Sequence, residues 1–158
     1  MTTSNRKSAP PVRIARGVSK FADLLVVDTN VMVSALLKAD SVPAAVLRSV
    51  LSGDALIAYD ARILLEYQDV LSRPRFGFSA LLIDQLLRYL VDIGVAVAAV
   101  PLAVFLPAPD DAKFLEVCLA AGARAQLITG NIKHFPLACR QGATVLTPRE
   151  WLDRWQGR

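Results

Sequence analysis

The strongest constraint on the fold is an alternation of short aliphatic segments and longer amphipathic segments along most of the chain. Short aliphatic runs bounded by turn residues predict strands, and apolar residues spaced three and four apart predict helices. The predicted strands are 24–27, 55–58, 95–100, 126–129 and 144–146. The predicted helices are 31–38, 43–51, 61–71, 79–92, 111–121 and a last one after Thr147-Pro148. This order predicts an α/β fold, a three-layer sandwich with a mostly parallel central sheet.

The charge of the chain is concentrated at its N-terminus. The chain has 158 residues, is 54% hydrophobic and carries a formal net charge of +4. The five basic residues and single acid of residues 1–23 account for that surplus, which leaves residues 24–158 balanced. We therefore expect a disordered basic arm at 1–23 and a single domain at 24–158. Such an arm could bind nucleic acid, although an organellar presequence or a start codon placed too early would look the same.

The apolar segments do not predict membrane insertion. The longest one is interrupted by Pro101, and the N-terminus has no hydrophobic signal segment. The two cysteines, Cys118 and Cys139, form no metal-binding or redox motif. We expect a cytoplasmic protein with no membrane contact.

Polar residues follow two of the predicted strands. Asp28 comes directly after 24–27, and Thr129 and Asn131 lie at the end of the strand predicted at 126–129. In a parallel sheet, the carboxyl ends of the strands form the edge where ligands bind. The simpler interpretations are that Asp28, Thr29 or Asn30 caps the next helix and that Thr129, Gly130 and Asn131 form a turn.

Glu66 lies in an apolar stripe of its predicted helix. It shares one face with Ile63, Tyr67 and Val70. A carboxylate in such a stripe needs a positive or donating partner. Arg62 could be that partner, or the side chain could lie at a solvent-exposed helix edge, so the stripe alone leaves both a structural and a functional role open.

Asp110 and Asp111 begin another predicted helix. One acid is enough to cap a helix, and Asp110 is the better candidate. Asp111 shares its face with Phe114, Leu115 and Cys118, so we expect its carboxylate to point toward the sheet.

Three carboxylates could therefore converge at one edge of the sheet. Crowded acids repel one another, and an all-oxygen set favours Mg²⁺ or Mn²⁺ over zinc. Such an ion can activate water and stabilise charge on a phosphodiester. The one histidine, His134, has no evident nucleophile as partner, and we expect it in a loop or on the surface.

Five motifs, in this order and spacing, resemble a PIN domain over about residues 24–155. They are Val-Asp-Thr-Asn-Val at 27–31, Glu66, Pro-Asp-Asp-Ala-Lys-Phe-Leu at 109–115, Ile-Thr-Gly-Asn at 128–131 and Leu-Thr-Pro-Arg-Glu at 146–150. The nearest resemblance is to bacterial PIN proteins described as toxins of toxin-antitoxin pairs, of the VapC type. It implies a Rossmann-like sandwich and a Mg²⁺- or Mn²⁺-dependent endoribonuclease that cuts single-stranded RNA and is restrained by an antitoxin.

The resemblance also implies roles for individual residues. Asp28, Glu66 and Asp111 match its three catalytic and metal-binding acids. Two further residues match supporting positions: Thr129 matches a conserved hydroxyl, and Asn30 matches a polar residue that supports the first acid. Asn131 matches a fourth ligand position, where many PIN domains have an acid. The neutral Asn131 predicts weaker binding of a second metal ion.

Other functions remain open from the sequence. The chain could be a PIN-like module that binds RNA or protein with little catalysis, and Asn131 favours that alternative. A small-molecule phosphatase with Asp28 as nucleophile is less favoured, because such chemistry usually needs a second acid two residues on and residue 30 is Asn. The many apolar residues at 42–51 and 81–91 predict either helices buried on two sides, a homodimer interface or an antitoxin groove.

Overall fold

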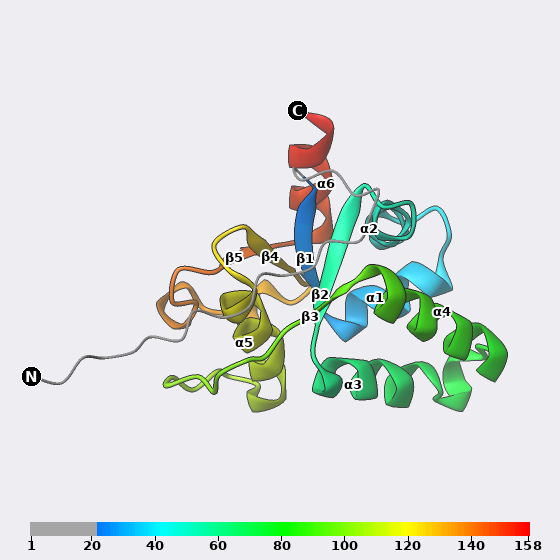
Figure 1. Cartoon of the computed structure of the whole chain (residues 1–158), viewed down its shortest axis with the longest axis horizontal. Helices are drawn as coiled ribbons and strands as arrows, with labels where there is room; N and C mark the ends of the chain where they lie inside the picture. Colours follow the sequence, from blue (N-terminus) through cyan, green and yellow to red (C-terminus); the bar gives the residue numbers. More distant parts are fainter. Residues whose placement is uncertain (1–21) are drawn as a thin grey trace, which may run out of the picture.

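The computed structural model describes residues 22–158, which form an α/β sandwich around a five-stranded sheet (Figure 1). All five strands are parallel, in the order β3-β2-β1-β4-β5. The predicted fold class is confirmed, whereas the predicted disordered arm lies outside the described residues apart from its last two. The strands are β1 (Asp23–Val27), β2 (Ala55–Tyr59), β3 (Val95–Ala96), β4 (Ala125–Ile128) and β5 (Thr144–Leu146).

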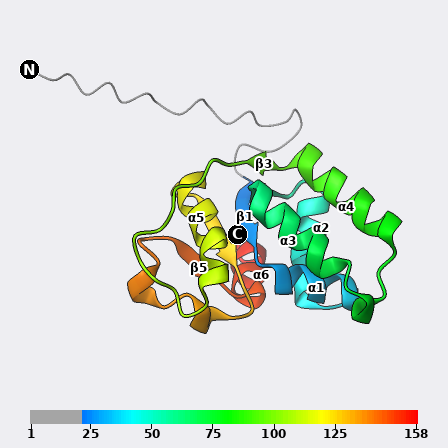
Figure 2. The same cartoon turned by 90° about the horizontal axis from the view of Figure 1, so that it is seen from below.

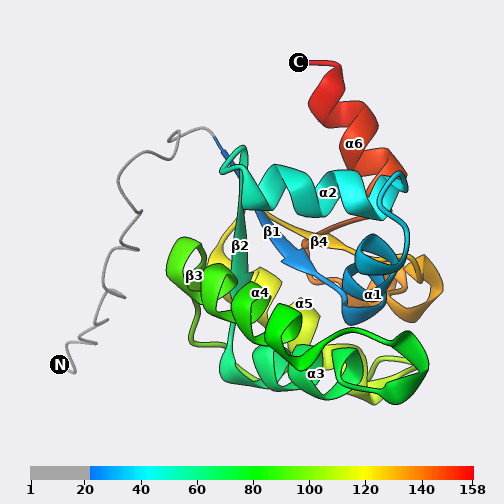
Figure 3. The same cartoon turned by 90° about the vertical axis from the view of Figure 1, so that its right-hand side faces the viewer.

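Six α-helices connect and cover these strands. Figure 3 shows α2 and α6 on one side of the sheet and α3, α4 and α5 on the other, while α1 follows the carboxyl end of β1. The helices are α1 (Thr29–Leu37), α2 (Val42–Leu51), α3 (Ala61–Leu71), α4 (Ala80–Ile93), α5 (Ala112–Ala121) and α6 (Pro148–Gln156). Four short 3₁₀ helices complete the connections: η1 (Pro74–Phe76), η2 (Pro109–Asp111), η3 (Ile132–His134) and η4 (Leu137–Cys139).

Local side-chain contacts fix where several helices begin. The side chains of Ser41, Asp60, Ser79 and Thr147 each accept a hydrogen bond from a backbone N–H in the first turn of the following helix. The helix α1 begins at Thr29, two residues earlier than predicted, because Asp28 is its cap. These caps satisfy backbone N–H groups that have no partner within the helix.

The predicted strand at 95–100 is wrong beyond its first residues. Only Val95 and Ala96 pair with β2, and Val97 adds one backbone bond to Tyr59. This strand lies at the sheet edge, where its second side has no neighbouring strand, and Pro101 has no N–H to donate. The close approach of α4 and β2 explains the nearby glycine, since a Cβ on Gly94 would lie 2.8 Å from the Ile57 carbonyl oxygen on β2.

The core lies on both faces of the central strands. Leu25, Val26, Leu127 and Ile128 are fully buried, and so is Trp151 on α6. Burial on both faces gives β1 and β4 a rigid position, and their carboxyl ends deliver Asp28 and Thr129 to the same edge.

Among residues 22–158, no single helix is long and apolar enough to cross a membrane. The helices α1 and α2 pass such a test only as a pair, by length and composition, and they meet at 99°.

Candidate active site

The site begins at the carboxyl ends of β1 and β4. Asp28 follows β1 and is 3% exposed, and Thr129 follows β4 and is fully buried. The Thr129 hydroxyl donates to Oδ2 of Asp28 at 2.7 Å, and the backbone N–H of Asn30 donates to Oδ1 at 3.3 Å. Asp28 therefore does cap α1, as the simpler interpretation proposed, and it also contacts Thr129 at the end of the neighbouring strand β4.

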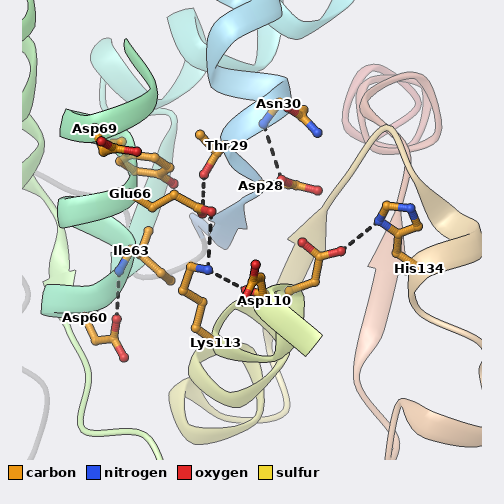
Figure 4. Close-up of polar contacts among 12 residues, drawn as sticks. Asp28, Thr29, Asn30, Asp60, Ile63, Glu66, Asp69, Asp110, Lys113 and His134 are labelled. Carbon is orange, nitrogen blue, oxygen red and sulfur yellow. Dashed lines mark hydrogen bonds and ion pairs between the residues drawn. The ribbon is translucent and has the colours of Figure 1, made fainter. Parts of the chain in front are cut away.

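Glu66 extends toward this edge from α3 (Figure 4). Its Oε2 accepts a hydrogen bond from the Thr29 hydroxyl at 2.7 Å, and its Oε1 lies 3.3 Å from Nζ of Lys113. The alternative that Arg62 pairs with Glu66 is wrong. Arg62 instead contacts two other acids, Asp60 and Glu116.

Asp111 is the N-cap residue of α5, but its side chain makes no capping hydrogen bond. Its Oδ2 lies 2.7 Å from Nδ1 of His134, on η3. The predicted cap by Asp110 is also wrong, because η2 and α5 both begin without a side-chain cap. The contact made by Asp110 is through its backbone carbonyl, which accepts from Lys113.

His134 therefore has a role that its sequence context did not show. It is on a short loop helix and its side chain is 41% exposed, as expected, but it contacts a candidate site acid. Figure 2 views the domain from the carboxyl edge of the sheet. In this view α5 lies to the left of β1 and α3 to its right, although both helices cover the same face of the sheet. The three acids thus approach the edge from three different elements.

The electrostatics of Asp28 show that the acids share one environment. Burial raises the pKa of Asp28 above its ordinary value, the hydrogen bonds from Thr129 and Asn30 oppose that rise, and the negative charges of Asp111 and Glu66 add to it. The pKa of Tyr67 is likewise raised by burial and, to a smaller extent, by Asp28 and Glu66. The sheet edge therefore gathers negative charge in a partly dry environment.

The two asparagines lie at the same edge with different contacts. The Asn30 side chain is exposed, and the contact of this residue with Asp28 comes from its backbone N–H. Asn131 is half-buried and donates its backbone N–H to the Thr129 hydroxyl at 3.0 Å. Both residues line one open surface pocket with Gly130. The side-chain support expected from Asn30 is thus supplied by Thr129.

The donor set fits a hard divalent cation by its chemistry. Asp28, Glu66 and Asp111 offer carboxylate oxygens, and the charges of Glu66 and Asp111 add to the rise that burial causes in the pKa of Asp28. Within the described part of the chain, however, no three acidic, histidine or cysteine side chains are grouped closely enough to hold a metal ion. Two of the candidate acids have basic neighbours instead, since Lys113 contacts Glu66 and His134 contacts Asp111.

Two contacting residues, Lys113 and Thr29, were missed as parts of the site. Lys113 stands in the motif at 109–115, two residues after Asp111, and the turn of α5 brings its ammonium to Glu66. Thr29 was considered as a helix cap, whereas its hydroxyl binds Glu66. The available signal was a buried stripe that contained an acid and therefore required donors.

Comparison with known proteins identifies the family of the chain. A family model described as PIN domain matches residues 24–133, which include every candidate acid and both asparagines. A search of curated proteins gave no match.

Proposed function

The chain belongs to the PIN domain family, whose members are generally nucleases, and from this premise we propose that it is a Mg²⁺- or Mn²⁺-dependent endoribonuclease acting on single-stranded RNA. One observation carries the proposal beyond the family. Among the described residues, the buried Asp28 receives hydrogen bonds only from neutral donors, while burial and, to a smaller extent, the charges of Asp111 and Glu66 raise its pKa. Such an arrangement has a stability cost in the protein alone, and a divalent cation would offset it.

The carboxylates of Asp28, Glu66 and Asp111 would hold the ion. A bound Mg²⁺ or Mn²⁺ supplies a lowered pKa for water and stabilises the charge that develops on the phosphodiester. Thr129 fixes one oxygen of Asp28, and Thr29 fixes one oxygen of Glu66. The half-buried Asn131 offers a neutral amide at the same edge. These contacts orient the acids before any substrate arrives.

The proposed biological role is that of a cytoplasmic toxin paired with an antitoxin. Support comes from α4, where Leu81, Leu82, Tyr89 and Val91 are 65%, 44%, 44% and 45% exposed. The alternative of a helix buried on two sides is therefore wrong. This exposed apolar face suits a homodimer or an antitoxin segment. An antitoxin could also inhibit by placing an Arg or Lys among the carboxylates, which predicts loss of metal in the complex.

The experiment that tests the activity is cleavage of a mixed single-stranded RNA pool with Mg²⁺, Mn²⁺ or EDTA. Asp111→Asn is compared with its neighbour Asp110→Asn, which removes the same charge one residue away from the His134 contact. We expect metal-dependent cleavage by the wild type and Asp110→Asn, and none by Asp111→Asn. Cleavage that survives EDTA, or that Asp111→Asn retains, would contradict the proposal.

The second candidate is a PIN-fold binding module with weak catalysis. The neutral Asn131 and the Lys113 contact with Glu66 favour it, because both reduce the negative charge available to a metal ion. RNA binding by a folded, partner-free protein that cleaves under no metal condition would establish this alternative.

A further inference from the structure

A lysine lies among the candidate acids in an unusually enclosed position. The Lys113 side chain is 14% exposed, and lysine side chains are mostly exposed in folded proteins. Its Nζ lies 3.3 Å from Oε1 of Glu66 and also donates to the backbone carbonyl of Asp110 (Figure 4). The ammonium lies 5.1 Å from the centroid of the Phe114 ring, which restricts its position from another side. Lys113 is therefore built into the edge.

Glu66 is held at both of its oxygens by different elements. Thr29 on α1 donates to Oε2, and Lys113 on α5 contacts Oε1. A cation that binds Glu66 through Oε1 has to lie beside the Lys113 ammonium, which contacts the same oxygen. Two positive charges so close together repel. Lys113 thus fixes the position of Glu66 and disfavours a further cation there.

The charges at the edge match a single divalent ion. When Asp28, Glu66, Asp111 and Lys113 are all ionised, two negative charges remain, and one divalent ion neutralises them. Residue 131 adds none, because it is Asn. A second divalent ion would leave the edge with net positive charge.

We propose that Lys113 is a positioning residue that holds Glu66 and takes the place of a second metal ion, so that the site binds one divalent cation. This inference rests on the proposed metal-dependent activity of the same site. The ammonium acts through Glu66, and its charge is fixed in the fold before metal arrives.

The test is a titration of the protein with Mn²⁺, in which electron paramagnetic resonance and calorimetry measure the number of bound ions and their affinity. Four proteins are compared: the wild type, Lys113→Met, the charge-conserving Lys113→Arg, and Lys133→Met as a control that removes an exposed charge on η3. We expect one Mn²⁺ per wild-type chain. Lys113→Met should bind its first Mn²⁺ roughly tenfold more tightly and take up a second, because a nearby positive charge has been removed. Lys113→Arg and Lys133→Met should resemble the wild type.

Several outcomes would overturn the inference. Two ions bound by the wild type would do so without any variant, which keeps the test decisive if Lys113→Met fails to fold. Unchanged Mn²⁺ affinity in a folded Lys113→Met protein would do so too. If Lys113 were merely structural, Lys113→Met would lower the free energy of unfolding and leave the affinity and stoichiometry of Mn²⁺ binding unaltered.

The proposed function can fail separately. Metal-dependent RNA cleavage with unchanged Mn²⁺ binding in Lys113→Met would overturn only the role of Lys113. Absence of both Mn²⁺ binding and RNA cleavage in the folded wild type would overturn the metal-dependent nuclease, and with it this inference.

Discussion

The two ends of β1 each carry a buried aspartate, and the two carboxylates are treated in opposite ways. Asp23, at the amino end, is 9% exposed and accepts hydrogen bonds from Nε1 of Trp151 at 2.9 Å and from Arg158 at 2.8 and 3.0 Å. Asp28, at the carboxyl end, is 3% exposed, and within residues 22–158 it accepts hydrogen bonds only from a hydroxyl and a backbone N–H. The carboxylate at the amino end is thus paired with the Arg158 guanidinium, whereas the one at the carboxyl end has the carboxylates of Glu66 and Asp111 as neighbours.

This difference separates a structural carboxylate from the one that we propose binds a metal ion. A buried charge costs free energy unless an opposite charge or several donors compensate it. At Asp23 the protein supplies the guanidinium of Arg158, so the carboxylate ties α6 and the end of the chain to the sheet. At Asp28 the compensation is incomplete, which leaves a place for a cation from solution. Residue type and burial alone would not distinguish the two.

The largest expected effect concerns RNA cleavage. Asp28→Asn should lower kcat/KM by roughly a thousandfold, which corresponds to about 4 kcal/mol of transition-state stabilisation. Asp23→Asn should stay within about threefold of the wild type, because its contacts lie at the opposite sheet edge. The measurement is cleavage of a fluorogenic single-stranded RNA with Mn²⁺. Equal losses in the two variants would remove the distinction between the ends.

The next effect is on stability and concerns the amino end. Asp23→Ala should lower the free energy of unfolding by about 2 kcal/mol, because it leaves the buried indole N–H of Trp151 without an acceptor. The contribution of Arg158 is smaller, since its side chain is 52% exposed and screened by solvent. Urea denaturation at pH 7 measures the change. The exposed ion-pair variant Asp84→Ala is the control and should change stability by less than about 0.5 kcal/mol.

The pH dependence of stability should sharpen the contrast. The folded pKa of Asp28 is raised above its ordinary value of 3.8, chiefly by burial, so the folded state favours the protonated form. That favourable contribution is fully present below the unfolded pKa and is lost as pH rises through the folded pKa. In EDTA, Asp28→Asn should therefore match the wild type at low pH and become the more stable protein at neutral pH. Denaturation curves at several pH values test this, and a wild type that is more stable than Asp28→Asn at pH 7 would contradict it.

The sequence predicted the strand and helix order and the edge on which Asp28 and Thr129 lie, because these features depend on local patterns. Periodicity placed Glu66 in a buried stripe but could not name its partners, since Thr29 is 37 positions away. The Asp28 and Thr129 contact spans 101 positions and became predictable only because parallel strands share an edge. Local reasoning offered Arg62 as one partner for Glu66, and tertiary packing supplied Lys113 instead.

Asp110 and the segment 95–100 show two other limits. Either of two adjacent acids satisfies the rules of helix capping, and neither side chain forms a cap here, because a 3₁₀ turn precedes α5. The composition of 95–100 favours a strand, yet pairing needs a neighbour and an N–H donor, which an edge position and Pro101 limit. Residue propensities therefore predicted which caps and strands these residues can form, but the neighbouring segments decided which of them form.

The smallest expected effect distinguishes the two donors to Asp28. Asn30→Ala should change the free energy of unfolding by less than about 0.5 kcal/mol and leave RNA cleavage within about twofold, because the backbone N–H that bonds Asp28 is retained. Thr129→Val removes a hydroxyl that bonds a buried carboxylate and should cost about 1 to 3 kcal/mol. Denaturation and cleavage assays on the two variants separate the contributions. A large loss of cleavage in a fully stable Asn30→Ala protein would instead place the exposed amide in contact with RNA, which would extend the carboxyl end from a metal site to a substrate-binding surface and widen its difference from Asp23.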